Sequence, residues 1–489
     1  MQLLLRNTHI AVTDYTPGLL PNLENAFSVK QMVRRYFYKR VPVGCIYDEK
    51  SKEFRVFGGV NPFYLRGLTG VYPYRQIGSD PYDDISIRLT SIPRDVVQSK
   101  MIQFLIGGDD YPENAKATQI SCNASTGLGK TFSAISAITY FRLKTMIITH
   151  RVNIKELWKK ELLTFTDIDV RRIILLKPED IYKIMNDPSL ADKYYIYIVV
   201  HRTITQVANV KGWDYITEFF KTIKIGLKIY DEAHREFAST TRIDCYTNTF
   251  KTYYLTATMK LAEFDANTVF QKVFSTVPRF DEKKDLGMTD AKKHIILIAY
   301  HYNSHPSIEA RAECKNKNRA GFNSKAHGMY QVEDDDHYFP GLFAFIDKFT
   351  VKKKLRTIIY NARIPGGIKI AEVLQNEYPD LKIGVYNSKV SADEKAEIVA
   401  GYDIIISTIE SIGLGENIPD LRCEINTQAF RFDGTGDQVS GRLRPPKDGG
   451  KSIYIEFIDE GFPSILSQFK HREKLYKKIF GEIIHISAS

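Results

Sequence analysis

The stretch that decides the fold is Ala124-Ser125-Thr126-Gly127-Leu128-Gly129-Lys130-Thr131. Its glycines let backbone N–H groups turn inward around phosphate oxygens, where a side chain would block the approach. We expect the Lys130 ammonium to neutralise the β- and γ-phosphates of ATP and the Thr131 hydroxyl to ligate Mg²⁺. The usual pattern begins with glycine and this one with Ala124, so Thr126–Thr131 carries the match. We predict that all residues from Ser125 to Thr131 bind ATP.

A second signal is Asp231-Glu232-Ala233-His234, which follows the apolar run Ile223–Tyr230. Acids that follow a buried strand lie at the carboxyl edge of a parallel sheet, where α/β proteins bind ligands. We expect Asp231 to hold Mg²⁺ through water, and Glu232 to orient and deprotonate the attacking water. Taken alone, the pair could equally cap a following helix. The phosphate loop upstream favours the catalytic interpretation.

The composition is that of a globular protein with more than one domain. The chain has 489 residues, of which 43% are hydrophobic and 26% charged, and this length exceeds one hydrophobic core. A net charge of +10 is compatible with a polyanionic partner but is weak support alone. Five cysteines without a Cys-x-x-Cys pair argue against a zinc module or disulfide framework. The sequence shows neither a signal-peptide core nor a long apolar run, so we expect a cytoplasmic protein without a membrane partner.

The pattern of apolar and polar residues changes twice along the chain. Residues 1–90 are aromatic and basic and include a predicted hairpin with arms Val43–Tyr47 and Glu53–Phe57, which indicates a small α+β accessory domain. Residues 91–280 alternate apolar strands with amphipathic helices, the pattern of a parallel sheet. Residues 281–489 repeat this alternation without a second phosphate loop. The predicted fold class is therefore α/β, with two tandem parallel-sheet domains behind the accessory domain.

The second half carries several strand-like runs, which are Arg356–Asn361, Lys382–Val385, Ile404–Ser407, Cys423–Asn426 and Ser452–Ile458. The charged stretch 278–294 is predicted to be a linker. The polar stretch 300–340 is predicted to be an irregular insertion. Its acidic run 333–337 could bind a metal, although a solvated loop is the stronger interpretation.

Two further groups of residues suit the same reaction. Thr256 and Thr258 follow the apolar strand Thr252–Leu255, and with His234 they could link the acidic pair to the second domain; β-branched filler is the alternative. The stretch Asp437–Pro446 supplies Gln438, Arg442 and Arg444. A planar, permanently charged guanidinium can meet the charge that develops on a transferring γ-phosphate. A surface basic patch is the alternative interpretation.

In this order, the motifs resemble those of helicase superfamily 2, over roughly residues 90–480. Thr126–Thr131 resembles motif I, Ile147–Arg151 with Leu157 and Trp158 motif Ia, Asp231–His234 the DEAH form of motif II, Leu255–Thr258 motif III, Ile358–Asn361 motif IV, Ser407–Gly415 motif V and Gln438–Arg444 motif VI. The resemblance implies two tandem RecA-like domains with ATP bound between them and Arg442 completing the site. It also implies that Arg94 and Gln98 read adenine, and that Gly415 and Asn417 lie near the ribose. Asn417 stands where an acid is common, and Arg444 lies closer to Arg442 than is usual.

The same resemblance implies a nucleic-acid track across both domains, held mostly by its phosphates. The candidate contacts are Thr149, His150, Arg151, His201, Arg202, Thr203, Asn361, Ser407 and Thr408. His201 could instead cap a helix, and Lys155, Lys159 and Lys160 are expected on a solvated helix face. A cluster near the N-terminus mixes aromatic and cationic side chains, namely Arg34, Arg35, Tyr36, Tyr38, Lys39, Arg40, Tyr72, Tyr74 and Arg75. It suits stacking on bases or gripping duplex DNA, and packing in a small core is an equal alternative.

Compact size, the pairing of Asp231–His234 with Leu255–Thr258 and a small N-terminal domain are similar to phage UvsW-type and XPB-like DNA helicases. The tail Ile455–Gly461, followed by a predicted basic helix to Lys478, is similar as well. This implies a monomeric motor that uses ATP and Mg²⁺, acts on single-stranded and branched DNA in recombination, repair or replication, and works in the host cytoplasm if phage-encoded. RNA is a possible partner, because an RNA helicase of the DEAH group is one alternative. The other is the ATPase motor subunit of a restriction-type DNA-binding complex.

Overall fold

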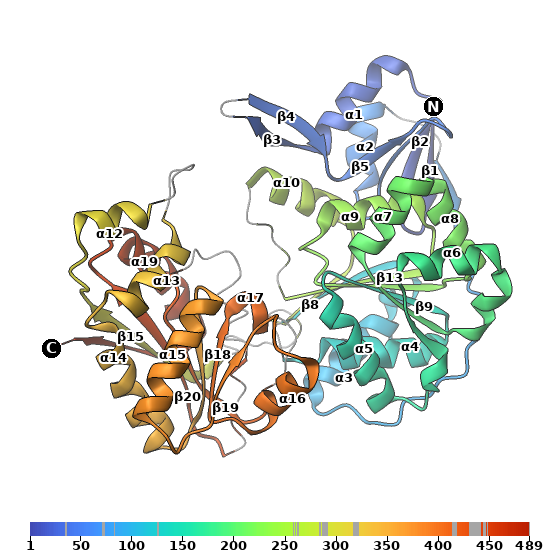
Figure 1. The fold of residues 1–489 in the computed structure, drawn as a ribbon. Helices are drawn as coiled ribbons and strands as arrows, with labels where there is room; N and C mark the ends of the chain where they lie inside the picture. The colour runs from blue at the N-terminus through green and yellow to red at the C-terminus, as the bar shows by residue number, and fades with distance from the viewer. Residues whose placement is uncertain are drawn as a thin grey trace. The chain divides into compact units, whose positions relative to one another are not determined.

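The computed structural model describes residues 1–34, 37–70, 74–82, 84–124, 127–257, 259, 261, 264–282, 285, 292–315, 322–412, 418–429, 442–443, 446 and 448–488. The chain divides into two compact units, residues 1–287 and 288–489 (Figure 1). Each unit contains a seven-stranded sheet whose strand pairs are all parallel. The predicted fold class is therefore confirmed.

The large sheet of unit 1 has the strand order β10-β11-β9-β12-β13-β8-β14. Its strands are β8 (Gln119–Asn123), β9 (Thr145–Thr149), β10 (Ile173–Leu175), β11 (Ile196–Val200), β12 (Leu227–Asp231), β13 (Lys251–Thr256) and β14 (Arg279–Asp281). Strands such as β11, Ile-Tyr-Ile-Val-Val, are buried along their whole length, because helices cover both faces of a parallel sheet. The order places β13 between β8, which leads into the phosphate loop, and β12, which ends at Asp231.

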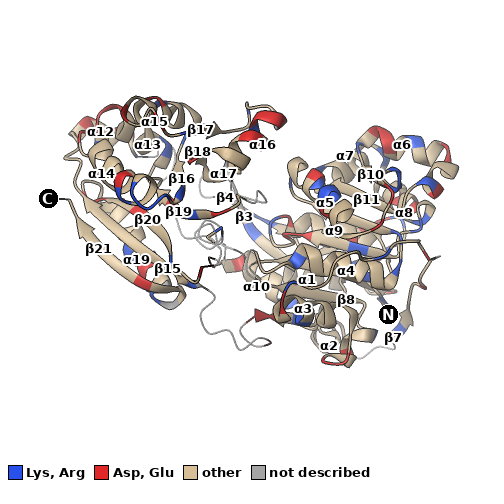
Figure 2. Ribbon diagram, turned by 90° about the horizontal axis from the view of Figure 1, so that it is seen from below, with Lys and Arg blue, Asp and Glu red and all other residues tan. Residues whose placement is uncertain are grey.

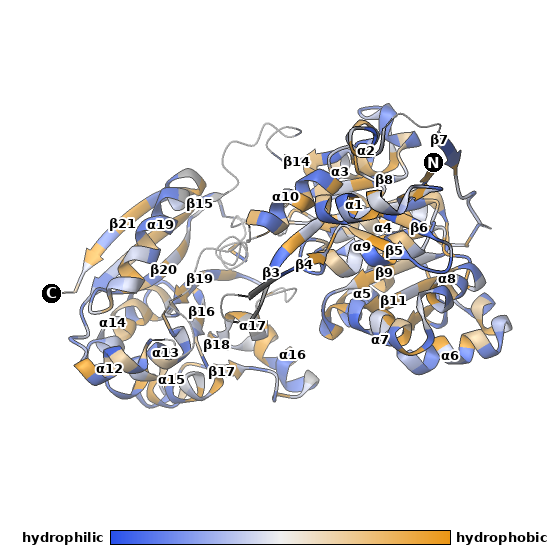
Figure 3. Ribbon diagram, turned by 90° about the horizontal axis from the view of Figure 1, so that it is seen from above, coloured by the Kyte–Doolittle hydropathy of each residue, from blue (hydrophilic) through white to orange (hydrophobic). Residues whose placement is uncertain are grey.

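Helices cover both faces of this sheet (Figure 1). One face packs against α3 (Val96–Ile106), α4 (Lys130–Phe141) and α5 (Val152–Phe165), and the other against α6 (Pro178–Asn186), α7 (His201–Lys211), α8 (Trp213–Thr222) and α9 (Phe237–Tyr246). The helices carry both hydrophobic and hydrophilic residues along their length (Figure 3), so each buries one side and exposes the other. α10 (Phe264–Val273) follows β13.

The N-terminal residues form a smaller five-stranded sheet of order β5-β6-β2-β1-β7. Its strands are β1 (Gln2–Arg6), β2 (His9–Thr13), β5 (Cys45–Asp48), β6 (Glu53–Phe57) and β7 (Tyr74–Ile77), with α1 (Leu20–Ala26), α2 (Pro62–Thr69) and a hairpin of β3 (Ser28–Arg34) and β4 (Phe37–Pro42) beside it. Antiparallel pairing of β5 with β6, which brings Asp48 opposite Glu53, confirms the hairpin predicted there.

The small sheet shares a hydrophobic core with the large sheet of unit 1. The ring of Phe57 lies 5.3 Å from that of Tyr254 and 4.7 Å from that of Phe274, measured between centroids. Hydrogen bonds also cross, because the Thr8 hydroxyl donates to the Asp244 carbonyl at 2.9 Å. Residues 1–90 therefore belong to the same compact unit as the phosphate loop, although they have a sheet of their own.

A buried polar network lies beneath the ends of β12 and β13. Asp244 on α9 forms an ion pair with Lys228, and both side chains are fully buried. The carboxylate of Asp244 also accepts hydrogen bonds from the hydroxyls of Tyr230 at 2.8 Å and Tyr254 at 2.6 Å. Lys228 donates a further hydrogen bond to the Thr247 hydroxyl at 2.6 Å. The network ties together the strands that carry Asp231 and Thr256.

The sheet of unit 2 has the order β17-β18-β16-β19-β20-β15-β21. Its strands are β15 (Lys292–Tyr302), β16 (Arg356–Asn361), β17 (Ile383–Tyr386), β18 (Ile404–Thr408), β19 (Leu421–Asn426), β20 (Ser452–Asp459) and β21 (Phe480–Ser487), and its helices include α12 (Ile308–Glu313), α13 (Ser324–Glu333), α14 (Tyr338–Phe345), α15 (Ile364–Glu377), α16 (Ala392–Gly401), α17 (Ile409–Ile412) and α19 (Pro463–Ile479). The five strands predicted in this half are confirmed within a residue or two at each end.

The prediction of an irregular insertion over 300–340 is wrong. That stretch begins inside β15 and continues through α12, α13 and the start of α14. Ser307 caps α12 by accepting a hydrogen bond from the Ala310 N–H, and Asp335 accepts one from the His337 N–H in the turn just before α14. The acidic run 333–337 thus joins two helices. Within the described ranges, neither this run nor any other group of His, Cys, Asp and Glu forms a metal cluster.

No helix in the described part of the chain combines the length and the apolarity that crossing a membrane requires.

Candidate nucleotide site

The phosphate loop adopts a backbone that only glycine tolerates well. β8 ends at Asn123 and α4 begins at Lys130. Gly127 has φ +88° and Gly129 φ +92°, both in the left-handed region that disfavours other residues. A Cβ atom on Gly129 would lie 2.1 Å from Nε2 of Gln98. The backbone therefore requires glycine at both positions, and at Gly129 the close approach of Gln98 leaves no room for a side chain. Ser125 and Thr126 lie outside the described residues.

The cationic side chain of the loop lies over its own backbone. Nζ of Lys130 donates to the Ala124 carbonyl at 2.7 Å. Lys130 also starts α4, whose first N–H groups have no intrahelical acceptor, so the helix N-terminus and the ammonium suit an anion. Thr131 follows in the first turn and is half-buried. The donors required for a phosphate chain are thus present.

Arg94 and Gln98 lie beside this loop. The Arg94 N–H donates to Oε1 of Gln98 at 2.7 Å, and Nη2 of Arg94 donates to the Gly127 carbonyl at 3.3 Å. Asp95 fixes the segment by capping α3, because its Oδ1 accepts the Gln98 N–H at 2.8 Å. Their expected role in reading adenine stays a prediction.

Asp231 is the last residue of β12 and is half-buried. Nε1 of Trp158 donates to its Oδ2 at 2.9 Å. Burial, and then the neighbouring charge of Glu232, raise the pKa of Asp231 to about 6, against the opposing effects of the Trp158 hydrogen bond and the Lys130 charge. Lys130 is thus close enough to act on this carboxyl. Sequence reasoning missed the Trp158 contact, although a tryptophan on the apolar face of α5 was a signal that it faced the sheet.

Glu232 has a strained backbone and an unsatisfied carboxylate oxygen. Its φ is +53°, which is uncommon for a residue with a side chain. Its Oε2 is buried without a hydrogen bond from any described residue, and Nδ1 of His234 lies 3.4 Å from it. Since α9 begins only at Phe237, the acidic pair does not cap that helix. A buried free acceptor and strain at one residue are typical of a functional site.

The end of β13 connects the phosphate loop with the acidic pair. Nδ1 of His234 lies 2.7 Å from the Thr256 hydroxyl, and the Thr256 carbonyl accepts the Ala124 N–H at 3.1 Å. Burial, with the positive charges of Arg235 and Lys130, lowers the pKa of His234 to about 4, so the imidazole is neutral at pH 7. Thr258 lies outside the described residues.

The predicted track residues of unit 1 follow the ends of β9 and β11, and several are buried. The Thr149 hydroxyl donates to the Arg151 carbonyl at 3.1 Å. His201 is the first residue of α7 and stacks on Tyr230 with centroids 5.7 Å apart. Its Nδ1 lies 3.0 Å from the Ser239 hydroxyl, and burial lowers its pKa to about 3.

The remaining candidates of this unit differ in exposure. Arg202 is exposed, Arg151 and His150 are half-buried, and Thr203 is buried. Burial, and then the charges of Arg235, Arg151 and two histidines, lower the pKa of His150 to about 3. Arginine side chains are therefore the groups that unit 1 presents to a polyanion at this edge.

In unit 2, Asn361, Ser407 and Thr408 lie at the ends of the adjacent strands β16 and β18. Nδ2 of Asn361 donates to the Arg363 carbonyl at 2.7 Å, and the Ser407 hydroxyl donates to the Tyr386 carbonyl at 2.7 Å. Oγ1 of Thr408 accepts the Ser411 N–H at 3.1 Å.

Arg442 is half-buried in unit 2. Its Nη2 donates a hydrogen bond to the Ile412 carbonyl. The other predicted residues of this unit, Gly415, Asn417, Gln438 and Arg444, lie outside the described residues.

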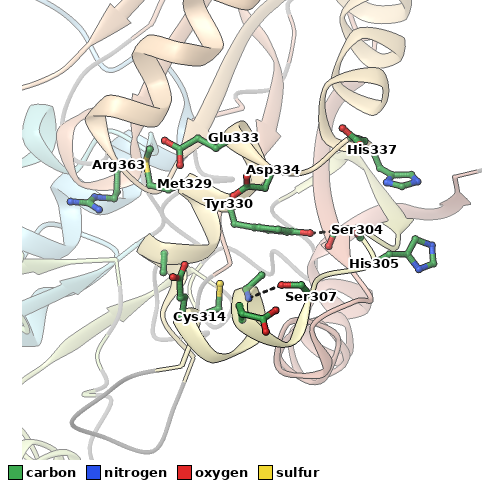
Figure 4. A pocket seen from close by; sticks show the side chains of 15 residues that line it. Ser304, His305, Ser307, Cys314, Met329, Tyr330, Glu333, Asp334, His337 and Arg363 are labelled. Carbon is green, nitrogen blue, oxygen red and sulfur yellow. Dashed lines mark hydrogen bonds between the residues drawn. The ribbon is translucent and has the colours of Figure 1, made fainter.

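Unit 2 also contains a cavity of about 670 Å³ at the ends of β15 and β16, beside α12 and α13 (Figure 4). The Tyr330 hydroxyl donates to the Ser304 carbonyl at 3.2 Å within it. Glu309, Glu313 and Glu333 contribute to the lining. An acidic lining repels phosphates, so this cavity does not suit a nucleotide.

Comparison with known proteins gives one family match. Residues 94–261 match the model described as "Type III restriction enzyme, res subunit". This range begins at Arg94 and includes the phosphate loop, the acidic pair and Thr256. No curated protein matches the chain closely enough to count as a relative.

Solved structures give the fold. Mss116p bound to ssRNA and AMP-PNP has 15% identity and a TM-score of 0.54, with 81% of this chain and 74% of that one covered. The DEAD-box helicase Mss116 bound to ssRNA and UDP-BeF has 15% identity and a TM-score of 0.51, with 81% and 75% covered. T4 UvsW has 13% identity over 99% of both chains, and its TM-score of 0.37 supports no conclusion. The first two confirm the tandem RecA-like arrangement of sheets.

Proposed function

We propose that this chain, which resembles helicase superfamily 2 in its motifs and its fold, is an ATP-dependent nucleic-acid translocase that unwinds or remodels branched DNA. The observation that carries the proposal is the meeting of three strand ends in unit 1. Asp231 and Thr256 are the last residues of the neighbouring strands β12 and β13, and Lys130 comes after the phosphate loop that follows β8. A phosphate cradle, an acidic pair and a connecting hydroxyl are the parts that hydrolysis of ATP requires.

Each residue has a proposed role in this site. ATP supplies the phosphoanhydride bond, and bound Mg²⁺ would neutralise phosphate charge. Thr131 and Asp231 would hold the Mg²⁺, and residues 125–130 would bind the phosphates. Glu232 would accept the proton of the attacking water, for which its buried free Oε2 is suited. Arg94 and Gln98 would contact the base, and Gly415 and Asn417 the ribose.

Coupling of hydrolysis to movement is proposed for a second set of residues. His234, Thr256 and Thr258 would relay the state of the acidic pair. Arg442, with Gln438 and Arg444, would meet the charge that develops on the γ-phosphate, because a guanidinium is planar and always ionised. Arg442→Ala should therefore retain ATP binding and lose hydrolysis. An Arg442→Ala variant with full turnover would remove this role.

Nucleic acid would be held by its phosphates, without reading of sequence. The proposed contacts are Thr149, His150, Arg151, His201, Arg202, Thr203, Asn361, Ser407 and Thr408. Of these, Arg202 is exposed and is the one we expect to contribute most to affinity. We propose single-stranded and branched DNA as substrate, a monomeric motor, and a role in recombination, repair or replication.

A second candidate function is the motor subunit of a restriction-type complex, favoured by the match of residues 94–261 to a res-subunit model. Such a motor would hydrolyse ATP on DNA and need partner subunits for its biological effect. Strand displacement on a forked substrate by the purified chain alone supports the helicase. ATPase activity on DNA without displacement supports the restriction-type motor.

The decisive experiment compares ATPase stimulation by single-stranded DNA, a four-way DNA junction and RNA. Lys130→Ala should abolish turnover, whereas Lys183→Ala, an exposed lysine on α6, should leave it unchanged. We expect the largest stimulation from the junction. Equal or greater stimulation by RNA would refute the DNA proposal in favour of an RNA helicase.

A further inference from the structure

The N-terminal sheet exposes an aromatic pair with an arginine between the rings. Phe63 on α2 is 74% exposed and Tyr74 on β7 is 59% exposed. The guanidinium carbon of Arg66 lies 5.5 Å from the centroid of each ring. We call these three side chains the aromatic–arginine surface. Both elements belong to the N-terminal part of unit 1 (Figure 2).

The exposed ring of Phe63 is not part of the packing that holds α2 in place. The same helix, α2, uses a different side for packing, because Leu65 is fully buried and the Tyr64 hydroxyl accepts from Nζ of Lys272 at 2.8 Å. The Tyr64 ring also packs edge-on against Phe27, with centroids 6.0 Å apart. Phe63 points away from this packed side and buries little area, so its phenyl ring contributes little to folding.

The charge of this surface is positive and uncompensated. Residues 61–79 contain two charged residues, Arg66 and Arg75, and no acid. Arg75 follows Tyr74 in β7 and is also exposed, on the opposite face of the strand. Among the described residues, no carboxylate pairs with Arg66, and its Nε is buried without a hydrogen-bond partner. A protein surface that only needed solubility would show mixed charges here.

We propose that the aromatic–arginine surface is a binding site for single-stranded nucleic acid, separate from the phosphate contacts at the sheet edges. Unpaired bases stack on Phe63 and Tyr74, and Arg66 neutralises an adjacent phosphate. Exposed ring faces favour unpaired bases over a duplex, whose bases are already stacked. The site rests on the proposed function in one respect, that the chain binds nucleic acid at all.

The test measures fluorescence anisotropy of a labelled oligothymidylate, and of a duplex, with the full chain. Phe63→Ala and Tyr74→Ala should each weaken binding of the single strand about fivefold or more, with less effect on the duplex. Tyr140→Ala is the matched control, because Tyr140 is 61% exposed near the end of α4, away from the phosphate loop. Basal ATPase without nucleic acid should be unchanged in all three variants.

The arginine gives a second readout. Arg66→Gln should lower the slope of log affinity against log salt by about 1, whereas Arg66→Lys should keep the slope. If the Phe63 and Tyr74 variants bind the single strand as tightly as Tyr140→Ala does, the proposed binding site is wrong. A protein-binding surface would then be the alternative. Failure of the wild-type chain to bind any nucleic acid would instead refute the proposed function.

Discussion

The buried pair of Lys228 and Asp244 gives the sharpest prediction for stability. Both side chains are fully buried, and Asp244 also accepts two tyrosine hydrogen bonds. Asp244→Asn keeps the shape and leaves the Lys228 ammonium without a counter-ion. Loss of one partner of a buried pair costs about 3–5 kcal/mol, a large part of the roughly 5–15 kcal/mol of a whole domain.

Lys228→Met should cost less than Asp244→Asn, because the two tyrosine hydroxyls still stabilise the remaining carboxylate. The double variant contains no unpaired charge, so its cost should be about 2 kcal/mol or more below the sum of the single variants. Glu218→Gln is the matched control. Its partner Lys221 lies 3.4 Å away in a pair that is more than half exposed, and such pairs contribute about 0–1 kcal/mol.

Urea unfolding followed by tryptophan fluorescence measures these costs in the intact chain. The chain has two tryptophans, Trp158 and Trp213, and both lie in unit 1, so their emission reports that unit alone. The reasoning would be refuted if Asp244→Asn lowered the free energy of unfolding by less than about 1 kcal/mol. It would also be refuted if the costs of the two single variants added up to the cost of the double variant, because the two charges would then not stabilise each other.

Three further predictions concern the nucleotide site and its surroundings. Gly129→Ala should weaken binding of a fluorescent ATP analogue at least tenfold. Gly212→Ala is the control and should bind the analogue normally, because Gly212 has a similar φ of +88° with open space around it. Equal affinities of the two variants would show that the close approach of Gln98 to Gly129 does not matter for ATP binding. Burial lowers the pKa of His201 to about 3, whereas the pKa of histidine in an unfolded chain is about 6.5. The unfolded chain therefore gains a proton at His201 between pH 6.5 and pH 5 and the folded chain does not, so the free energy of unfolding should fall by about 2 kcal/mol over this range. His201→Gln should reduce that fall in urea titrations, and an unchanged fall would contradict the burial. Thr256→Val should bind ATP normally but lose stimulation by nucleic acid in a steady-state assay, and full stimulation would exclude the hydroxyl from coupling.

The sequence predicted the large sheets well because their strands are nearly continuous apolar runs. Ile404–Ser407 is an example, since parallel strands are buried on both faces. The strands β15 and β21 were missed for the opposite reason. β15 starts with the charged pair Lys292 and Lys293 inside the predicted linker, and β21 is an edge strand whose residues are mostly exposed.

Side-chain contacts of the site were less accessible to sequence reasoning. Lys155 was expected on a solvated face, but it is buried and its Nζ donates to the Leu176 carbonyl at 3.1 Å. Local pattern does not reveal such a contact, because the acceptor comes from a distant segment. The same holds for Trp158 and Asp231. Arg94 and Gln98, by contrast, do lie beside the phosphate loop.

The packing of Phe57, in the small sheet, against Tyr254 on β13 has a practical consequence for truncation experiments. Removing residues 1–90 would expose Tyr254 and Phe274 to solvent, because Phe57 packs against both rings. It would thereby destabilise β13, the strand that lies between the phosphate loop and the acidic pair. Such a truncated chain would lose turnover through collapse of its ATPase half, even if the missing part never touched DNA. Single substitutions at solvent-facing positions are therefore the means to dissect what that sheet contributes.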